Sequence, residues 1–223
     1  LLDERNRMNG TNPGVQAIFL YPLNALIASQ RKRIHAWCDA VNQRANVGIT
    51  YGVYTSDSEE TVNAETIRNF HPQVKDRRTI RTNPPQILFT NPNMLEYMMV
   101  RNEDQELVNN STNLKWIILD EAHTYNGSSA AELAILIKRV LQLFGKSPAD
   151  VRFAITSATI GEGKEKEMRE FISNLTGKDA ATEFHFVSGR RIVPSVDEDK
   201  ARYKIDQINE RFGLNVSYEN ILQ

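Results

Sequence analysis

Two adjacent carboxylates follow a strongly apolar run near the middle of the chain. The run Trp116–Leu119 leads directly into Asp120 and Glu121, and His123 comes two residues later. An apolar run that ends in acids is typical of a buried strand that delivers them to the edge of a sheet, where α/β proteins gather their functional groups. One carboxylate can hold a hydrated Mg²⁺ while its neighbour orients or deprotonates a water. The pair is therefore suited to nucleotide hydrolysis.

Small hydroxyl residues follow a second apolar run, at residues 151–155. They include Ser157 and Thr159, on either side of Ala158. Taken alone, such residues most often cap a helix. This group comes one crossover after the acidic motif, so adjacent parallel strands would place its hydroxyls near His123. There they would connect a nucleotide site to a second surface.

Two further strand-to-helix junctions combine polar residues with a proline. The first contains Pro22 and Asn24, and the second contains Thr90 and Asn91 before Pro92. Proline suits the first turn of a helix, and the free amides of a helix N-terminus can hold a phosphate. Both junctions are also compatible with ordinary turns. If they bind the phosphates of one strand, the binding is indifferent to base sequence.

Apolar runs and helical patterns alternate along the chain, which predicts an α/β fold with a parallel sheet covered by helices on both faces. The expected strands cover residues 15–20, 47–53, 86–89, 116–119 and 151–155, with a weaker one at 183–187. The expected helices cover residues 25–44, 59–70, 93–101, 129–144, 164–175 and 197–212. Loops are expected at residues 9–14, 75–85 and 145–150.

Composition narrows the class of protein. Apolar residues make up 40% and charged residues 25% of the 223 residues, which is ordinary for a globular protein. The net charge of -1 gives no global attraction to nucleic acid or to an anionic membrane, so such contacts must be local. Cys38 is the only cysteine, which excludes a disulfide within the chain and suits a reducing cytoplasm. The most apolar stretch, residues 130–144, is too short and too charged to span a bilayer, and the N-terminus has no signal-peptide pattern. We therefore expect a cytoplasmic protein with no membrane partner.

The motifs occur in the order of a known family. Together they resemble the first RecA-like domain of superfamily 2 helicases of the DEAD/DEAH-box type. Within that type, the resemblance is close to the large bacterial Lhr-like helicases. The resemblance covers about residues 15–180. It rests on motif II at residues 120–123, motif III at 157–159, motif Ia at 21–26, motif Ib at 90–95, and a further strand-contacting turn at 51–57 that contains Thr55.

The resemblance implies ATP hydrolysis coupled to movement on nucleic acid, with DNA favoured over RNA. Asp120 would hold Mg²⁺ through water, and Glu121 would position or activate the attacking water. His123 would couple the ATP site to strand binding together with Ser157 and Thr159. The nucleic-acid backbone would be held by Pro22, Asn24, Thr55, Thr90 and Asn91. A second RecA-like domain of the same protein would complete the helicase.

The chain departs from the family pattern because it contains no Gly-x-x-x-x-Gly-Lys-Ser/Thr motif, and residues 161–164 have the wrong spacing for it. We therefore expect a fragment: residues 1–190 would be an N-terminally truncated RecA-like domain, and 191–223 the start of a linker or inserted segment. In the family, the strand that leads into the phosphate loop lies between the strands of motifs II and III. Either another part of the protein or a partner copy supplies that strand here, or the two flanking strands close up.

Two other functions compete with the helicase interpretation. The isolated chain would serve as a sequence-independent nucleic-acid-binding module that hydrolyses nothing, because nothing replaces the phosphate-loop lysine. A metal-dependent hydrolase would use Asp120, Glu121 and His123 as ligands. Three ligands on one turn have poor geometry for a closed site, and no His-Glu-x-x-His spacing supports this alternative.

Overall fold

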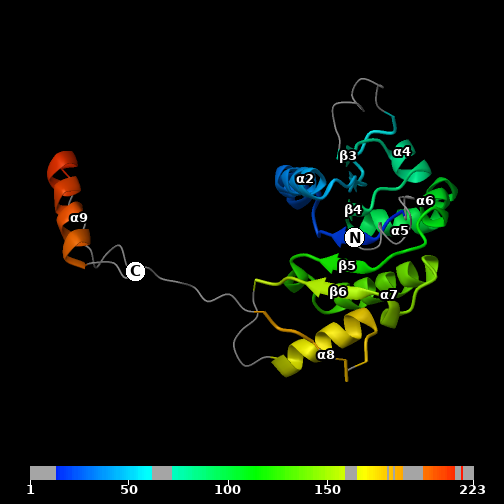
Figure 1. Ribbon diagram of the computed structural model, residues 1–223. Helices are drawn as coiled ribbons and strands as arrows, with labels where there is room; N and C mark the ends of the chain where they lie inside the picture. Colours follow the sequence, from blue (N-terminus) through cyan, green and yellow to red (C-terminus); the bar gives the residue numbers. More distant parts are fainter. Residues whose placement is uncertain are drawn as a thin grey trace. The chain divides into compact units, whose positions relative to one another are not determined.

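The computed structural model describes residues 14–61, 72–158, 165–179, 181–182, 184–187, 198–213 and 217. The chain divides into two compact units, Leu1–His185 and Phe186–Gln223. The first unit contains a six-stranded, all-parallel sheet with the order β3-β2-β4-β1-β5-β6 (Figure 1). The strands are β1 (Ala17–Leu20), β2 (Tyr51–Val53), β3 (Gln73–Val74), β4 (Ile87–Thr90), β5 (Trp116–Leu119) and β6 (Arg152–Ile155). The predicted α/β fold with a parallel sheet is confirmed.

Helices connect β1 to β2, β3 to β4, β4 to β5 and β5 to β6, as is usual in a parallel sheet. The first unit contains α2 (Asn24–Ala45), α4 (Arg77–Thr82), α5 (Pro92–Val100), α6 (Gln105–Asn109), α7 (Ser128–Leu143) and α8 (Glu165–Thr176). Three short 3₁₀ turns are η1 (Asn102–Asp104), η2 (Ala122–Thr124) and η3 (Pro148–Asp150). Helices α7 and α8 pack side by side, and α5 packs on α7 (Figure 1). The second unit contains α9 (Glu198–Phe212).

The sheet separates two apolar cores because successive side chains of a strand point to opposite faces. On one face, Ile18 of β1 and Ile117 of β5 join a large cluster that includes α5 and α7. On the other face, Phe89 of β4 lies in a smaller cluster with Ile27 and Ile34 of α2. The predicted helices on both faces are therefore present. No helix in the described ranges is long and apolar enough to cross a membrane.

Strands β5 and β6 pair directly with each other. Leu119 lies opposite Ile155 in a parallel register, and the Thr156 amide donates to the Leu119 carbonyl at 2.9 Å. The backbone groups of β5 thus find partners without an inserted strand, as buried backbone groups must. The hypothesis that another segment or a partner copy supplies a strand between them is wrong for this structure. The two strands close up instead.

Several predicted elements differ from the structure. Residues 75–85 were expected to form a loop, but they contain α4, which begins because the Asp76 side chain accepts from the Thr79 amide at 2.8 Å. The weak strand expected at 183–187 is not formed over 184–187, where Val187 is 92% exposed. Residues 59–61 lie outside any helix. The rest of the helix expected at 59–70 lies outside the described residues, as do Thr159 and residues 161–164.

Candidate functional site

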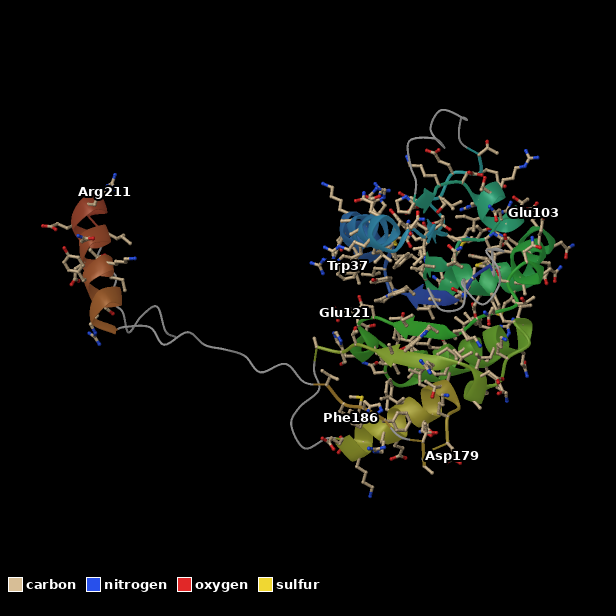
Figure 2. All side chains as sticks on the ribbon, viewed as in Figure 1. Trp37, Glu103, Glu121, Asp179, Phe186 and Arg211 are labelled. Atoms are coloured by element: carbon tan, nitrogen blue, oxygen red, sulfur yellow. The ribbon has the colours of Figure 1, made fainter. Side chains whose placement is uncertain are left out.

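The turns that follow the strands meet at one edge of the sheet, because all of the strands are parallel. The Asp120 amide donates to the Leu20 carbonyl at 3.0 Å, and the Tyr21 amide donates to the Thr90 carbonyl at 3.1 Å. These bonds place the turn after β1 between the turns after β5 and β4. Figure 2 labels Glu121 in the turn after β5. The acidic motif and the two proline-containing junctions therefore share one sheet edge, as predicted.

Residues 120–123, which we call the acid turn, are clamped to the end of β6 by Thr156. The Thr156 hydroxyl donates to Asp120 Oδ1 and accepts from the Glu121 amide at 3.2 Å. The Ala122 amide donates to the Thr156 carbonyl at 2.9 Å. Glu121 has a φ of 53° and a ψ of 42°, in the left-handed region that a residue with a Cβ seldom adopts. The Thr156 contacts hold the acid turn in this strained conformation.

Thr156 was not among the predicted site residues. Thr156 follows Ile155 as Asp120 follows Leu119, and the direct pairing of those two strand ends, which the family pattern did not predict, brings the two residues together. Hydroxyls near the acid turn were expected, but the one that contacts its carboxylate comes a residue before Ser157.

The acid turn offers a carboxylate oxygen of the kind through which Mg²⁺ is commonly held, directly or through a water. Asp120 is half-buried, and its Oδ1 is used by Thr156, which leaves Oδ2 for a water of a hydrated ion. Mg²⁺ is commonly held by one or two carboxylates, several waters and the phosphates of a substrate. In the described part of the chain, no three His, Cys, Asp or Glu side chains are grouped to hold a metal. A hydrolase with three protein ligands therefore has no site there.

His123 joins the acid turn to the turn after β6. Its Nδ1 lies 3.2 Å from Glu121 Oε2, and the Ala158 amide lies 3.4 Å from the same nitrogen. A protonated Nδ1 donates to the carboxylate, whereas an unprotonated Nδ1 accepts from the amide, so the two contacts exclude each other. Ser157 and His123 both line a cavity of about 240 Å³ beside α8. The predicted proximity of this motif to His123 is thus seen at Ser157 and Ala158.

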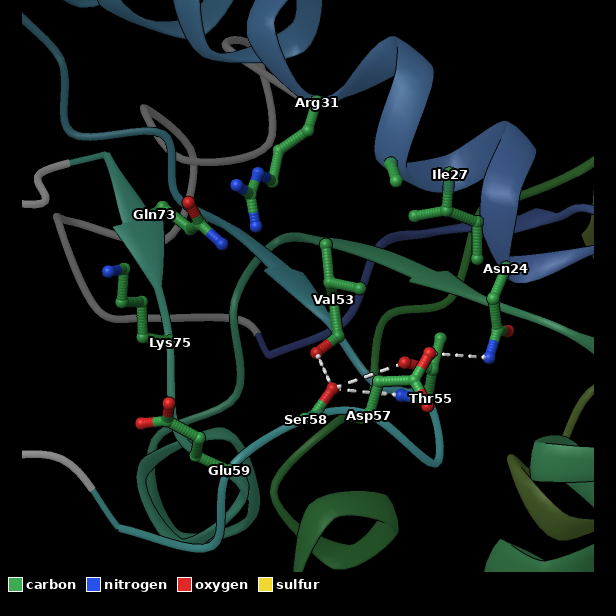
Figure 3. Close-up of a pocket in the computed structure, with 11 residues that line it drawn as sticks. Asn24, Ile27, Arg31, Val53, Thr55, Asp57, Ser58, Glu59, Gln73 and Lys75 are labelled. Atoms are coloured by element: carbon green, nitrogen blue, oxygen red, sulfur yellow. Dashed lines mark hydrogen bonds between the residues drawn. The ribbon is translucent and has the colours of Figure 1, made fainter.

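On the other side of the β1 turn, the Asn24 side chain joins three turns. Its Oδ1 accepts from Asn91 Nδ2 at 2.6 Å, and its Nδ2 donates to Asp57 Oδ2 at 3.0 Å and to Ser56 Oγ at 3.2 Å. Figure 3 shows Asn24 beside the turn after β2. Asn91 also caps α5, since its Oδ1 accepts from the Met94 amide at 2.8 Å. We call these four side chains, Asn24, Ser56, Asp57 and Asn91, the asparagine network.

The remaining residues predicted to contact nucleic acid fall into two groups. Pro22 lies in the same groove as Asn24 and Asn91. Thr90 is fully buried and its hydroxyl donates to the Tyr54 carbonyl at 2.7 Å, while Thr55 is 4% exposed and its amide donates to a serine hydroxyl, Ser58 Oγ, at 3.0 Å. The side chains of these two threonines shape the turns from within.

The groove contains cationic and aromatic side chains that sequence reasoning missed. Its volume is about 580 Å³, and it is lined by Pro22, Leu23, Asn24, Ser56, Arg77, Asn91, Asn93, Met94, Tyr97 and Arg101. Arg77 Nη2 donates to the carbonyls of Thr55 at 2.7 Å and Ser56 at 3.0 Å. The Arg101 guanidinium lies 5.0 Å from the centre of the Tyr97 ring. Arg77 and Tyr97 belong to helices rather than to strand ends, and Arg101 is the C-cap of α5. The four-residue spacing of Tyr97 and Arg101 was the available signal in the sequence.

A buried ionic network supports the turn after β2. Asp104 is fully buried, and its Oδ1 accepts from Arg81 Nε at 2.8 Å and from the Tyr54 hydroxyl. Burial and the hydrogen bond to Asp104 raise the pKa of Tyr54. Burial alone would lower the pKa of Arg81, but its bonds to Asp104 and Tyr54 raise it above the ordinary arginine range. Tyr54 directly precedes Thr55, so this network fixes the start of the turn.

The sequence is similar to a known family and to known proteins. The profile of the DEAD/DEAH box helicase family matches residues 2–168. The uncharacterized ATP-dependent helicase MJ1574 of Methanocaldococcus jannaschii is 26% identical over 76% of this chain and 22% of its own length. The uncharacterized ATP-dependent helicase YprA of Bacillus subtilis is 28% identical over 79% of this chain and 19% of its own length.

A solved structure shows the same similarity. The crystal structure of the DUF1998 helicase MrfA bound to DNA matches with a TM-score of 0.52 and 25% identity, over 79% of this chain and 21% of that one. MrfA bound to DNA and AMPPNP matches with a TM-score of 0.50 and 26% identity, over 77% of this chain and 20% of that one. The chain spans about a fifth of the length of each of these relatives. By its sequence profile and its parallel α/β sheet, the chain belongs to the DEAD/DEAH box helicase family.

Proposed function

We propose that the chain is part of the ATP-binding domain of a DEAH-type helicase or translocase, which couples ATP hydrolysis to movement on nucleic acid, with DNA favoured. The observation that carries the proposal is the sharing of one sheet edge by the acid turn and the asparagine network, with the β1 turn bonded between them. A nucleotide bound at the acid turn and a nucleic-acid strand bound at the asparagine network would therefore both act on the turn after β1. The complexes of MrfA with DNA and AMPPNP support both ligand classes.

In this proposal the acid turn performs the hydrolytic chemistry. Asp120 would hold a hydrated Mg²⁺, which when bound neutralises developing charge on the phosphates. Glu121 would orient the attacking water and accept its proton. His123 would couple this event to Ser157 and Thr159, since its Nδ1 lies within reach of both Glu121 and the turn after β6.

The strand-binding half uses the groove. Pro22, Asn24 and Asn91 would contact phosphates there, which positions a strand without reading its sequence. Thr55 and Thr90 would support this binding through the turns that they hold. A second RecA-like domain would complete the helicase in the cytoplasm, with residues 1–190 as part of the first domain and 191–223 as the start of a linker or insertion.

The test is ATP hydrolysis with and without single-stranded DNA, for the 223-residue chain and for a version extended at both ends. We expect hydrolysis by the extended version only, because the short chain has no phosphate-loop lysine. DNA should stimulate hydrolysis, and Glu121→Gln should abolish it. Glu106→Gln, at an exposed glutamate on α6, is the matched control and should leave the rate unchanged. Turnover by the short chain would contradict the account of the missing lysine.

A binding module without ATPase activity is the second candidate for the isolated chain. The groove and the asparagine network lie entirely within the described residues, so strand binding does not require the missing loop. We expect the short chain to bind single-stranded DNA in a fluorescence anisotropy titration while it hydrolyses nothing. Failure to bind would remove this candidate.

A further inference from the structure

We propose that Tyr97 and Arg101 form a platform on which a base of a single-stranded nucleic acid stacks. The inference rests on the proposed function, since it takes the groove beside the asparagine network as the strand-binding surface. It adds a contact to the base, whereas the motif residues would contact phosphates. Tyr97 lies on α5 and Arg101 is the C-cap of that helix, so both come after residues 90–95, which resemble motif Ib.

The geometry of the pair suits a base. Tyr97 is 54% exposed although it is aromatic, and it lines the groove together with Asn24 and Asn91. The Arg101 guanidinium covers the ring at 5.0 Å from its centre, which orders the ring and leaves its remaining exposed surface for a stacking partner. Aromatic rings that accept unstacked bases, with help from arginine, are a common feature of single-strand binding.

The position along α5 matches the proposed phosphate contact. Asn91 caps the helix and Tyr97 lies six residues further along it, which corresponds to a rise of about 9 Å at about 1.5 Å per residue. Stacked nucleotides advance by about 3.4 Å each. A strand held by a phosphate at Asn91 therefore reaches Tyr97 within about three nucleotides.

The charges around the groove favour the same path. Arg77 and Arg101 both line it, and neither has a salt-bridge partner among the residues that the structure describes. A neighbouring cavity on the other side of Asn91 is lined instead by Glu96 and Glu132. Carboxylates repel phosphates, so a strand that leaves Asn91 is directed toward Arg101 rather than toward α7. The chain has a net charge of -1, so attraction of a strand must come from such local cations.

The experiment is a binding titration of the 223-residue chain with two single-stranded oligodeoxynucleotides, one intact and one built of abasic nucleotides. Tyr97→Ala should weaken binding of the intact strand by a factor of roughly 5 to 150, the range for losing one stacked base. Tyr97→Phe should bind like the wild type. With the abasic strand, the wild type and Tyr97→Ala should bind equally. Tyr203→Ala, at a tyrosine of α9 that is 65% exposed, is the matched control and should change nothing.

Two further measurements separate the roles of the pair. A 2-aminopurine base in the intact strand should lose fluorescence when it stacks on the wild type and should keep it with Tyr97→Ala. Arg101→Gln should reduce the slope of log K against log salt by about 0.7, the value for one phosphate contact on a single strand.

The outcomes distinguish this inference from the proposed function. If Asn24→Ala weakens binding but Tyr97→Ala does not, the platform is rejected and the strand-binding groove survives. If Tyr97→Ala weakens binding of the intact and abasic strands equally, the ring does not contact a base and the platform is again rejected. If the wild-type chain binds neither strand, the platform and the binding-module candidate both fail, and the helicase proposal is still tested by ATP hydrolysis in the extended version.

Discussion

Replacing Arg81 by methionine should destabilise the first unit strongly. Arg81 is a buried residue whose Nε donates to Asp104 Oδ1 at 2.8 Å and to the Tyr54 hydroxyl at 3.0 Å. Asp104 is fully buried, and its Oδ2 already lacks a hydrogen-bond partner. Methionine fills a similar volume but leaves this carboxylate without a counter-charge. Breaking a buried ion pair from one side costs about 3–5 kcal/mol.

That loss is large compared with the stability of a typical domain, which is about 5–15 kcal/mol. Most of the loss comes from the unpaired Asp104 carboxylate. The other partners of Arg81, which are Glu60 and Glu103, are exposed and regain water. Exposed ion pairs contribute at most about 1 kcal/mol each. The double variant Arg81→Met/Asp104→Leu removes both buried charges, and it should recover at least about 2 kcal/mol of the loss.

Urea unfolding followed by tryptophan fluorescence measures this effect, because Trp37 and Trp116 both lie in the first unit. Arg78→Met, at an exposed arginine on the same helix, is the control and should change the unfolding free energy by less than about 0.5 kcal/mol. The reasoning is refuted if Arg81→Met costs less than about 1 kcal/mol, or if the double variant is no more stable than the single one.

Three other outcomes follow from single positions. Gly14→Ala should lower the unfolding free energy by at least about 2 kcal/mol, because φ is +68° and a Cβ would lie 2.1 Å from the Asn110 carbonyl oxygen. Gly145→Ala, at φ +62° with nothing within 4 Å of the added Cβ, should cost only the backbone strain of about 1 kcal/mol, and equal losses would contradict the steric argument. Burial raises the pKa of the Cys38 thiol to about 11, so iodoacetamide at pH 8 should alkylate it roughly a hundred times more slowly than free cysteine, and the rate should rise with pH up to that value; a plateau below pH 9 would disprove this. Thr156→Val removes the hydroxyl that holds the acid turn, and it should slow ATP hydrolysis by the extended version about tenfold or more, whereas an unchanged rate would show that the clamp is not needed.

The sequence alone was sufficient for the parts of the fold that depend on local pattern. The apolar run Trp116–Leu119 is a strand with the predicted bounds, and α2, α5, α7 and α8 begin and end within a residue or two of the predicted helices. The strand-end motifs lie at one sheet edge because parallel strands present the same end together. These inferences needed only periodicity and chain direction.

The parts that sequence reasoning missed depend on tertiary contacts. Helix α4 has six residues, too few for a periodic pattern, and it is stabilised by the Asp76 cap and by the buried contacts of Arg81. Thr156 reaches Asp120 only because β5 pairs directly with β6, whereas the family pattern placed another strand between them. Tyr97 and Arg101 face the groove because α5 packs on α7, and no motif encodes that packing.

In the proposed function, the asparagine network affects how a nucleic-acid strand would bind. The amide of Asn24 is occupied at both ends, since Oδ1 accepts from Asn91 and Nδ2 donates to Ser56 and Asp57. A phosphate oxygen that takes a hydrogen from Nδ2 must therefore displace a partner, and Asp57 offers an oxygen of the same charge. Under the proposed function, strand binding would therefore exchange one anion for another at Asn24 Nδ2, and the turn after β2 would be released from Asn24 as the phosphate took its place.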